Sequence, residues 1–265
     1  MSAFKMAAVD LDGTLLRSDR SISARTRTAV ARARDAGVEI VFVTARHSAA
    51  IEGFVSDLSL TGEAVCCIGA AVHTLPSTAL TWSSTLAPAD SVEIARRIAA
   101  HFPGLSLGWV LRSGPLGYQP GYPGRLLIGP SFHADPLLID EPVLKMWAIG
   151  DGLGEHRPDA LARVVDGLAD VAHHGRGFVD LVAPGVTKVG TLGRLCEARG
   201  IDASQVVAFG DAEADLPMLA WAGHGVMMAN GRPELHPLAD EVAPGCDDDG
   251  VAVVLERIVG KEVAL

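Results

Sequence analysis

Residues 6–16 read MAAVDLDGTLL, and this stretch decides the fold. Its first four residues are apolar and are expected to form a buried strand. Asp10 and Asp12 follow, two positions apart, so strand alternation would bring both carboxylates to one point. Gly13 then permits a sharp turn that leaves both acids at the carboxyl end of the strand, where open α/β sheets build their sites.

Two carboxylates this close repel each other unless a cation lies between them, and oxygen ligands of this kind suit Mg²⁺. One acid can attack an electrophile while the other transfers a proton. The same residues could instead form only a polar turn after a strand. The pattern further along the chain decides between these two interpretations.

The composition is that of a folded protein with one large domain or two modest ones. The chain has 265 residues, of which 49% are hydrophobic and 20% charged. Its net charge of −10 argues against nucleic acid or an anionic membrane as the main partner, because both select basic surfaces. An anionic substrate would therefore need a local positive site or a metal.

The cysteines and the amino terminus give no sign of a secreted, disulfide-bonded protein. Cys66, Cys67, Cys196 and Cys246 show no Cys-x-x-Cys spacing, so neither a zinc site nor a disulfide framework is expected. Residues 1–5 lack a basic region followed by an apolar core, and no run of about 18 apolar residues follows. We expect a cytoplasmic protein.

Strands and helices alternate at both ends of the chain, which predicts a doubly wound, Rossmann-like parallel sheet of the α/β class. Ser23 is a plausible cap for a helix through Ala36. The other expected strands of this part are 38–43, 64–68, 205–209, 225–228 and 241–243, with further helices at 48–58, 188–200 and from residue 250.

The pattern changes in the middle of the chain. Short alternating segments at 79–86, 105–111, 125–128, 144–149 and 177–183 are joined by expected helices at 90–102 and 158–169 and by a Gly/Pro-rich loop at 114–124. We expect an inserted α+β cap domain at residues 79–181, with residues 1–78 and 182–265 forming the catalytic core.

Three polar side chains follow expected core strands. Asp10, Thr44 and Asp211 each stand just past an apolar run. Since parallel strands end at one edge of the sheet, these residues from distant parts of the sequence should meet there. That coincidence favours a site over an isolated turn.

The order of motifs resembles that of the haloacid dehalogenase (HAD) superfamily of phosphatases. The matching residues are Asp10-Leu11-Asp12-Gly13-Thr14-Leu15, Thr44, Lys188 and Gly210-Asp211-x-x-x-Asp215. The chain is most similar to the Cof-type branch, which carries a large α/β cap between its second and third motifs. Residues 223–230 and 249–251 resemble that branch too.

The resemblance implies a role for each matching residue. Asp10 would attack phosphorus and form an aspartyl phosphate, and Asp12 would protonate the leaving oxygen and then activate water. Asp10, the backbone carbonyl of Asp12, and Asp211 would bind Mg²⁺. The remaining roles are phosphate binding by Thr44, Lys188 and the backbone N–H groups of Leu11 and Ala45, and orientation of Lys188 or a metal-bound water by Asp215.

Four positions depart from the family pattern. Ala45 stands in place of a usual Gly, Ile68 in place of Asn, Val189 in place of Gly, and Ala214 in place of an Asn that often touches the phosphate. None of them is the nucleophile, the acid/base, the lysine or the metal aspartate. The departures bear on efficiency and substrate more than on reaction type.

The resemblance implies an Mg²⁺-dependent phosphomonoester phosphatase that acts on a small phosphorylated metabolite, with a sugar phosphate as the expected class. One alternative is a phosphotransferase that passes the phosphoryl group to a sugar hydroxyl. Another is a non-catalytic phosphate-binding or phospho-receiver protein. Candidates for recognising the leaving group are the 114–124 loop, with Tyr118, Gln119 and Tyr122, and the nearby Arg112 and Arg125.

Overall fold

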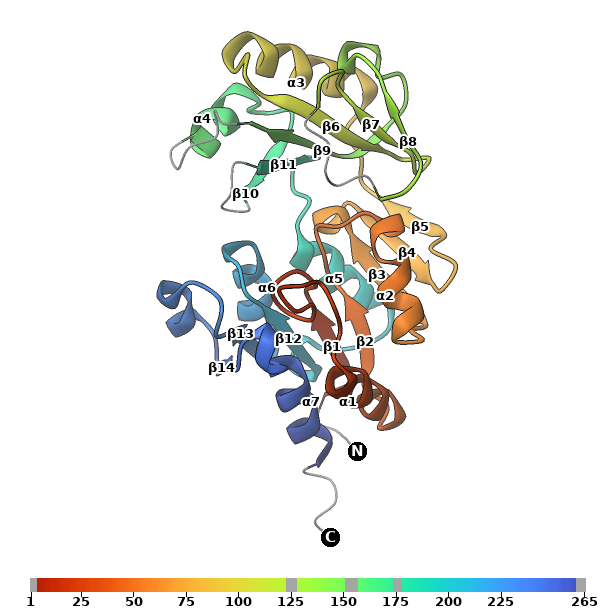
Figure 1. The fold of residues 1–265 in the computed structure, drawn as a ribbon, viewed down its shortest axis with the longest axis vertical. Helices are drawn as coiled ribbons and strands as arrows, with labels where there is room; N and C mark the ends of the chain where they lie inside the picture. The colour runs from red at the N-terminus through yellow and green to blue at the C-terminus, as the bar shows by residue number, and fades with distance from the viewer. Residues whose placement is uncertain (1–3, 123–127, 151–156, 174–177, 261–265) are drawn as a thin grey trace.

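The computed structural model describes residues 4–122, 128–150, 157–173 and 178–260. Figure 1 shows an elongated molecule with a core that carries both chain ends and a cap at the opposite end. The core is built from the two outer parts of the sequence and the cap from the middle part. The carboxyl ends of the core strands point toward the cap.

The core is a parallel sheet of five strands in the order β14-β13-β12-β1-β2. Its strands are β1 (Met6–Val9), β2 (Glu39–Phe42), β12 (Val206–Gly210), β13 (His224–Met228) and β14 (Glu241–Ala243). All four residues of β1 are buried, as expected for a strand covered on both faces. This sheet confirms the expected doubly wound α/β class.

Helices cover both faces of the core sheet. They are α1 (Ala24–Asp35), α2 (Glu52–Asp57), α5 (Lys188–Ala198), α6 (Leu216–Trp221) and α7 (Gly250–Gly260). Alternate strand residues divide between two apolar clusters: Val9 and Phe42 lie in one with Val30 of α1, and Ala8 and Val41 lie in the other. Ser23 caps α1 as expected, because its hydroxyl accepts from the N–H of Thr26.

A small antiparallel sheet lies beside the core sheet. It contains β3 (Gly62–Cys66), β4 (Ala71–Leu75) and β5 (Leu80–Ser83), and a single parallel bridge between Val43 and Val65 joins it to the core. Two expectations need correction here. The third apolar strand pairs mainly with β4 and not with the parallel sheet. The strand at 80–83, assigned above to the inserted segment, also pairs with β4.

The cap is a six-stranded sheet with the order β10-β11-β9-β6-β7-β8. Its elements are α3 (Pro88–His101), β6 (Ser106–Leu111), β7 (Leu116–Tyr118), β8 (Ser131–His133), β9 (Val143–Ile149), α4 (Arg157–Val164), β10 (Asp170–His173) and β11 (Phe178–Val182). Helix α3 lies on the face that points away from the core (Figure 1). The other face looks onto the ends of the core strands.

Two expectations for the cap differ from the structure. Residues 116–118, expected within a loop, form β7 and pair with β6. The expected strand at 125–128 lies mostly outside the described residues, and the strand next to β7 is β8 instead. Periodicity fails for β7 because a three-residue strand with glycine at its centre is too short to show alternation.

Short 3₁₀ helices fill several connections: η1 (Ser48–Ala50), η2 (Cys67–Gly69), η3 (Pro136–Leu138), η4 (Ala203–Gln205), η5 (Glu213–Asp215), η6 (Pro233–Leu238) and η7 (Cys246–Asp248). Among the described residues, none of the helices combines the length and apolar composition that crossing a bilayer requires.

Candidate active site

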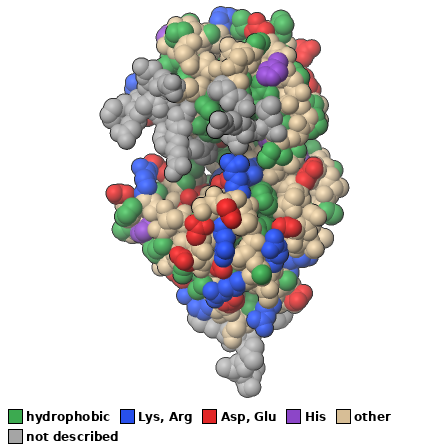
Figure 2. All heavy atoms as spheres, viewed as in Figure 1, with side chains coloured by type: hydrophobic (Ala, Val, Ile, Leu, Met, Phe, Trp, Pro, Cys, Tyr) green, Lys and Arg blue, Asp and Glu red, His purple; other side chains and the backbone are tan. Residues whose placement is uncertain are grey.

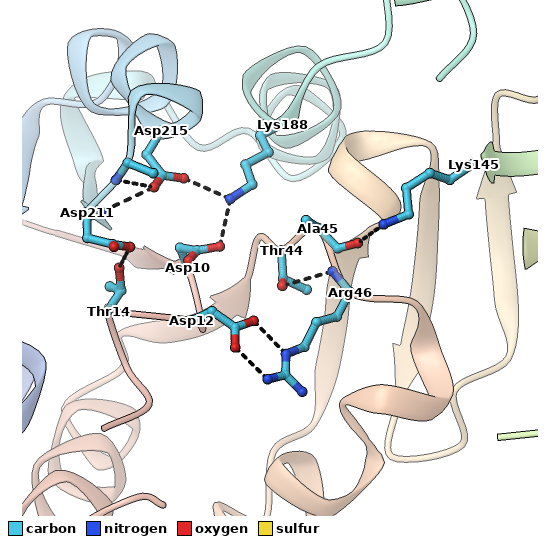
Figure 3. A network of polar contacts seen from close by, with 11 residues as sticks. Asp10, Asp12, Thr14, Thr44, Ala45, Arg46, Lys145, Lys188, Asp211 and Asp215 are labelled. Atoms are coloured by element: carbon cyan, nitrogen blue, oxygen red, sulfur yellow. Dashed lines mark hydrogen bonds and ion pairs between the residues drawn. The ribbon is translucent and has the colours of Figure 1, made fainter. Parts of the chain in front are cut away.

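The ends of three neighbouring core strands carry the polar residues singled out by the sequence. Asp10 directly follows β1, Thr44 lies two residues beyond β2, and Asp211 directly follows β12. Lys188 is the first residue of α5, where Thr187 forms the cap by accepting from the N–H of Gly190. Figure 3 shows these side chains meeting at one edge of the sheet.

Lys188 forms the centre of the network. Its Nζ lies 2.6 Å from Asp10 Oδ1 and 2.8 Å from Asp215 Oδ1, and all three side chains are buried. Burial alone would lower the pKa of Lys188, but the two carboxylates overcome that effect and hold its pKa above the ordinary value. Lys188 therefore presents a permanent positive charge beside Asp10.

The carboxylates outnumber this one lysine. Burial, followed by repulsion from Asp215 and Asp211, raises the pKa of Asp10 to about 8 despite Lys188. Burial and Asp215 likewise raise the pKa of Asp211 to about 6. Carboxyl oxygens of Asp10, Asp211 and Asp215 all lie within 4.8 Å of one another. Such a set of buried oxygen donors with too little positive charge fits a divalent cation such as Mg²⁺.

Asp211 and Asp215 are held in different ways. Asp215 Oδ2 accepts from the backbone N–H groups of Asp211 and Ala212, at 3.2 and 3.1 Å, while its other oxygen binds Lys188. Within the part of the chain that the structure describes, Asp211 accepts one side-chain bond, from the hydroxyl of Thr14 to its Oδ1 at 2.9 Å. Both oxygens of Asp215 are thus engaged with the protein, which suits orientation of Lys188, whereas Asp211 keeps more of its capacity for a metal.

Gly13 makes the approach of Asp211 possible. Its φ of 82° lies in the left-handed region, and a β-carbon there would overlap the Asp211 carboxylate. Asn230 fixes the turn, because its side-chain N–H donates to the carbonyl of Gly13 at 2.8 Å.

The carboxylate of Asp12 does not converge with that of Asp10, and this corrects the expectation from strand alternation. Strand β1 ends at Val9, so the alternation stops before Asp12. The Asp12 side chain is 55% exposed and forms a bidentate ion pair with Arg46. Asp10 and Asp12 nevertheless line the same cavity.

The loop after β2 lies on the other side of the cavity. Thr44 is buried, and its hydroxyl accepts from the N–H of Arg46 at 3.1 Å. Ala45 lines the cavity, and Leu11 is fully buried. Thr44 and Ala45 are thus brought to the site, and the phosphate-binding roles of these residues stay predictions.

Arg46 and Lys145 also line this cavity, although the sequence motifs assign them no role. Arg46 follows the second motif directly and binds Asp12, so the motif itself was the available signal. Lys145 comes from cap strand β9, and its Nζ donates to the carbonyl of Ala45 at 2.8 Å. A lysine inside an apolar strand was the only sequence signal for it.

The cavity has a volume of about 340 Å³ and is lined by both core and cap. Figure 2 shows acidic and basic side chains gathered on the core directly below the cap. Of the cap candidates, Tyr118 and Tyr122 line this cavity. Gln119 instead accepts from the N–H of Leu107, and Arg112 donates to Ser83. Arg125 lies outside the described residues.

Comparison with known proteins places this geometry in a family. The family model for haloacid dehalogenase-like hydrolases matches residues 7–110 and 151–255. The chain is 27% identical to the pyridoxal phosphate phosphatase YbhA of Escherichia coli, covering 94% of this chain and 96% of that protein. It is 26% identical to the 5-amino-6-(5-phospho-D-ribitylamino)uracil phosphatase YitU of Bacillus subtilis, covering 95% and 96%.

A solved structure agrees over nearly the whole length. A haloacid dehalogenase-like hydrolase from Bacteroides thetaiotaomicron superposes with a TM-score of 0.82 at 25% identity, covering 96% of this chain and 99% of the other. The resemblance inferred from the motifs is thereby confirmed. The chain belongs to the haloacid dehalogenase-like hydrolases, in their Cof-type phosphatase branch.

Proposed function

We propose that the protein is an Mg²⁺-dependent phosphomonoester phosphatase that acts on a small phosphorylated metabolite through an aspartyl phosphate on Asp10. The observation that carries the proposal is the buried Asp10–Lys188–Asp215 network with the Asp211 carboxylate beside it. A nucleophile, a cation for the transferred charge and an oxygen-rich metal site then lie together.

The metal would be held by the carboxylates of Asp10 and Asp211 and by the backbone carbonyl of Asp12. When bound, Mg²⁺ supplies positive charge to the phosphoryl oxygens and to the crowded carboxylates. The raised pKa values of Asp10 and Asp211 support this assignment, because both carboxyl groups lack sufficient positive charge in the protein alone.

The first half-reaction uses Asp10 and Asp12. A carboxylate oxygen of Asp10 forms a bond to phosphorus while the bond from phosphorus to the ester oxygen breaks, and Asp12 gives its proton to that departing oxygen. Lys188 neutralises charge on the transferred group, and Thr44 with the N–H groups of Leu11 and Ala45 holds its oxygens. Asp12 has to leave its ion pair with Arg46 to act as an acid.

The second half-reaction returns the enzyme to its starting state. Asp12, now ionised, takes a proton from water, whose oxygen attacks phosphorus. The bond between phosphorus and Asp10 breaks, and inorganic phosphate leaves. Asp215 keeps Lys188 in place through both steps, since its second oxygen is anchored by two backbone N–H groups.

The inserted segment would act as a cap domain over this chemistry. Its sheet lies above the core strand ends and contributes part of the cavity wall. Two relatives are named as phosphatases of pyridoxal phosphate and of a phosphorylated uracil derivative, which supports a small phosphorylated metabolite as substrate. The net charge of −10 argues against nucleic acid or an anionic membrane as the main partner of the protein.

Phosphate release from p-nitrophenyl phosphate tests the proposal. We expect release with Mg²⁺ and none after chelation, and we expect Asp10→Asn to abolish it with an unchanged circular dichroism spectrum. Asp57→Asn is the matched control, because Asp57 is exposed and pairs with Arg27 on the surface. Activity in folded Asp10→Asn would reject the nucleophile. Transfer of the phosphoryl group to a sugar hydroxyl without free phosphate would identify a phosphotransferase. If no ester released phosphate, the protein would be a non-catalytic phosphate-binding protein.

A further inference from the structure

The face of the cap sheet that looks onto the core carries a wall of large side chains. Alternate residues of three strands contribute to it, and all of them line the cavity that contains Asp10. They are Leu116 and Tyr118 of β7, Lys145 and Trp147 of β9, and Phe178 and Asp180 of β11. Four of these six side chains are apolar or aromatic over most of their surface.

The strand register places three of these positions in one row with Gly108. Tyr118 is opposite Gly108, Gly108 is opposite Trp147, and Trp147 is opposite Asp180. A β-carbon at Gly108 would overlap the indole ring of Trp147. The missing side chain of Gly108 therefore lets the indole lie close against the sheet, between Tyr118 and Asp180.

The aromatic part of the wall is tightly packed. The Tyr118 and Trp147 rings are 5.7 Å apart at 72°, and the Tyr118 and Tyr122 rings are 4.9 Å apart. Trp147 Nε1 donates to the Tyr122 hydroxyl at 2.7 Å. The Tyr118 hydroxyl is buried without a hydrogen-bond partner among the described residues. Such a rigid aromatic surface favours a flat ligand.

Lys145 adds one charged donor to this wall. Its buried Nζ lies 3.0 Å from Asp180 Oδ1 and 2.8 Å from the carbonyl of Ala45, and it stands 5.6 Å from the centre of the Trp147 ring. An ammonium has three N–H groups, and these two partners are the ones recorded among the described residues, so one N–H remains for a further acceptor. Figure 3 shows that Lys145 reaches from the cap to the loop that carries Thr44 and Ala45.

We infer that the leaving group of the natural substrate is a flat heteroaromatic ring that carries a hydrogen-bond acceptor at its edge. The inference rests on the proposed phosphatase function and names the substrate class of the same site. Trp147, Tyr118 and Phe178 contact the ring, and Lys145 donates to its acceptor. A sugar is not flat, and any of its hydroxyl groups that lay against Leu116, Trp147 and Phe178 would find few hydrogen-bond partners there.

A series of phosphate esters with the same CH₂–O–phosphate group tests this inference in the wild-type enzyme. The series is pyridin-3-ylmethyl, benzyl and cyclohexylmethyl phosphate, with glucose 6-phosphate as the sugar. We expect kcat/KM to fall in that order, by about tenfold from the pyridine to the cyclohexane and by at least as much again to the sugar. Glucose 6-phosphate turned over as well as the pyridine ester would overturn the inference.

Two variants test whether the side chains of this wall cause the preference for flat rings. Trp147→Leu should reduce the ratio of kcat/KM between benzyl and cyclohexylmethyl phosphate severalfold, and Lys145→Met should reduce the ratio between the pyridine and benzyl esters. Phe132→Leu is the matched control, since Phe132 packs against Trp109, which alternates to the opposite face of the sheet from Trp147. Unchanged ratios in Trp147→Leu and Lys145→Met would contradict the assignment.

The two levels of the proposal fail in different ways. If no phosphate is released from any ester, including p-nitrophenyl phosphate, the phosphatase function itself is wrong. If phosphate is released without preference for the flat rings, the function stands and the inferred substrate class is wrong. Should a variant not fold, the wild-type series alone decides.

Discussion

Arg46 binds both carboxylate oxygens of Asp12, with Nε 2.6 Å from Oδ2 and Nη2 2.5 Å from Oδ1. Asp10, two residues earlier, is bound instead by Lys188. The two acids therefore have separate cations and very different exposure, 9% for the Asp10 side chain and 55% for that of Asp12. This asymmetry suits a fixed nucleophile and an acid/base group that has to move.

We expect Asp12→Asn to remove proton transfer while leaving attack by Asp10 intact. With p-nitrophenyl phosphate, whose leaving group needs little protonation, dephosphorylation should fall by about 10²-fold or more and phosphorylation should fall less. Acid-quenched mass spectrometry should then find phosphate on Asp10. Equal loss of both steps, or phosphate on residue 12 in the wild type, would reverse the roles, and Asp57→Asn serves as the control.

Asp211 and Asp215 should differ in their effects on the metal. We expect Asp211→Asn to weaken Mg²⁺ binding by about tenfold or more, because a ligand is lost. Asp215→Asn should lower kcat by about 10²-fold with a smaller change in Mg²⁺ affinity, because Asp215 is already engaged with Lys188 and two backbone N–H groups. Calorimetric Mg²⁺ titrations and initial rates separate the two effects. The assignment is wrong if Asp215→Asn weakens Mg²⁺ binding more.

A strained turn supports the loop that carries Thr44. Ile68 has φ 61° and ψ 22°, in the left-handed region, which costs a β-branched residue about 1–2 kcal/mol. Its N–H donates to the carbonyl of Thr44, and the N–H of Cys67 donates to that of Arg46. The usual family residue here is Asn, which tolerates this conformation. Ile68 adopts the same left-handed turn at a conformational cost.

Substitution at Ile68 should therefore lower the free energy of unfolding by less than the burial of this side chain implies. Burying an isoleucine side chain stabilises the fold by about 1.5–3 kcal/mol, and strain relief offsets much of that loss in Ile68→Asn. We expect Ile40→Asn, in strand β2 and equally buried, to destabilise the protein by at least about 2 kcal/mol more. Urea unfolding followed by circular dichroism measures both. Equal losses would show that the turn stores no strain.

The ends of three neighbouring core strands were predictable from sequence, because each continuous apolar run stops just before a polar residue of the site. Asp10, Thr44 and Asp211 follow such runs, and parallel pairing brings them together whatever the details of the loops. The helix cap at Ser23 was predictable for a similar reason, since the capping bond is local.

Contacts that depend on long-range packing were not predictable. Asp12 turns toward Arg46 because the strand stops earlier than alternation assumed. Lys145 contacts a carbonyl 100 residues away, and no local pattern encodes that approach. Strand β5 pairs with β4 and so belongs to the small sheet beside the core. The sequence pattern alone assigned β5 to the inserted segment.

His47 gives a pH dependence with a definite sign. It lines the cavity, and burial, followed by the positive charges of Lys145 and Arg46, lowers its pKa from 6.5 to about 4. The unfolded chain therefore takes up a proton near pH 6.5, whereas the folded protein does so only near pH 4. Above about pH 6.5 the titration of His47 does not change the stability of the fold. As the pH falls from about 6.5 toward 4, it destabilises the fold.

Replacing His47 should remove that part of the acid sensitivity. After allowance for its partial exposure, we expect the loss of unfolding free energy between pH 7 and pH 5 to be smaller by about 1–2 kcal/mol in His47→Gln than in the wild type. His101→Gln, at an exposed position at the end of α3, should behave like the wild type. Urea unfolding at the two pH values gives the difference directly, and comparison between variants cancels the other titrating groups. If His47→Gln loses as much stability as the wild type, the imidazole is already protonated in the folded protein, and a third positive charge stands beside Lys145 and Arg46.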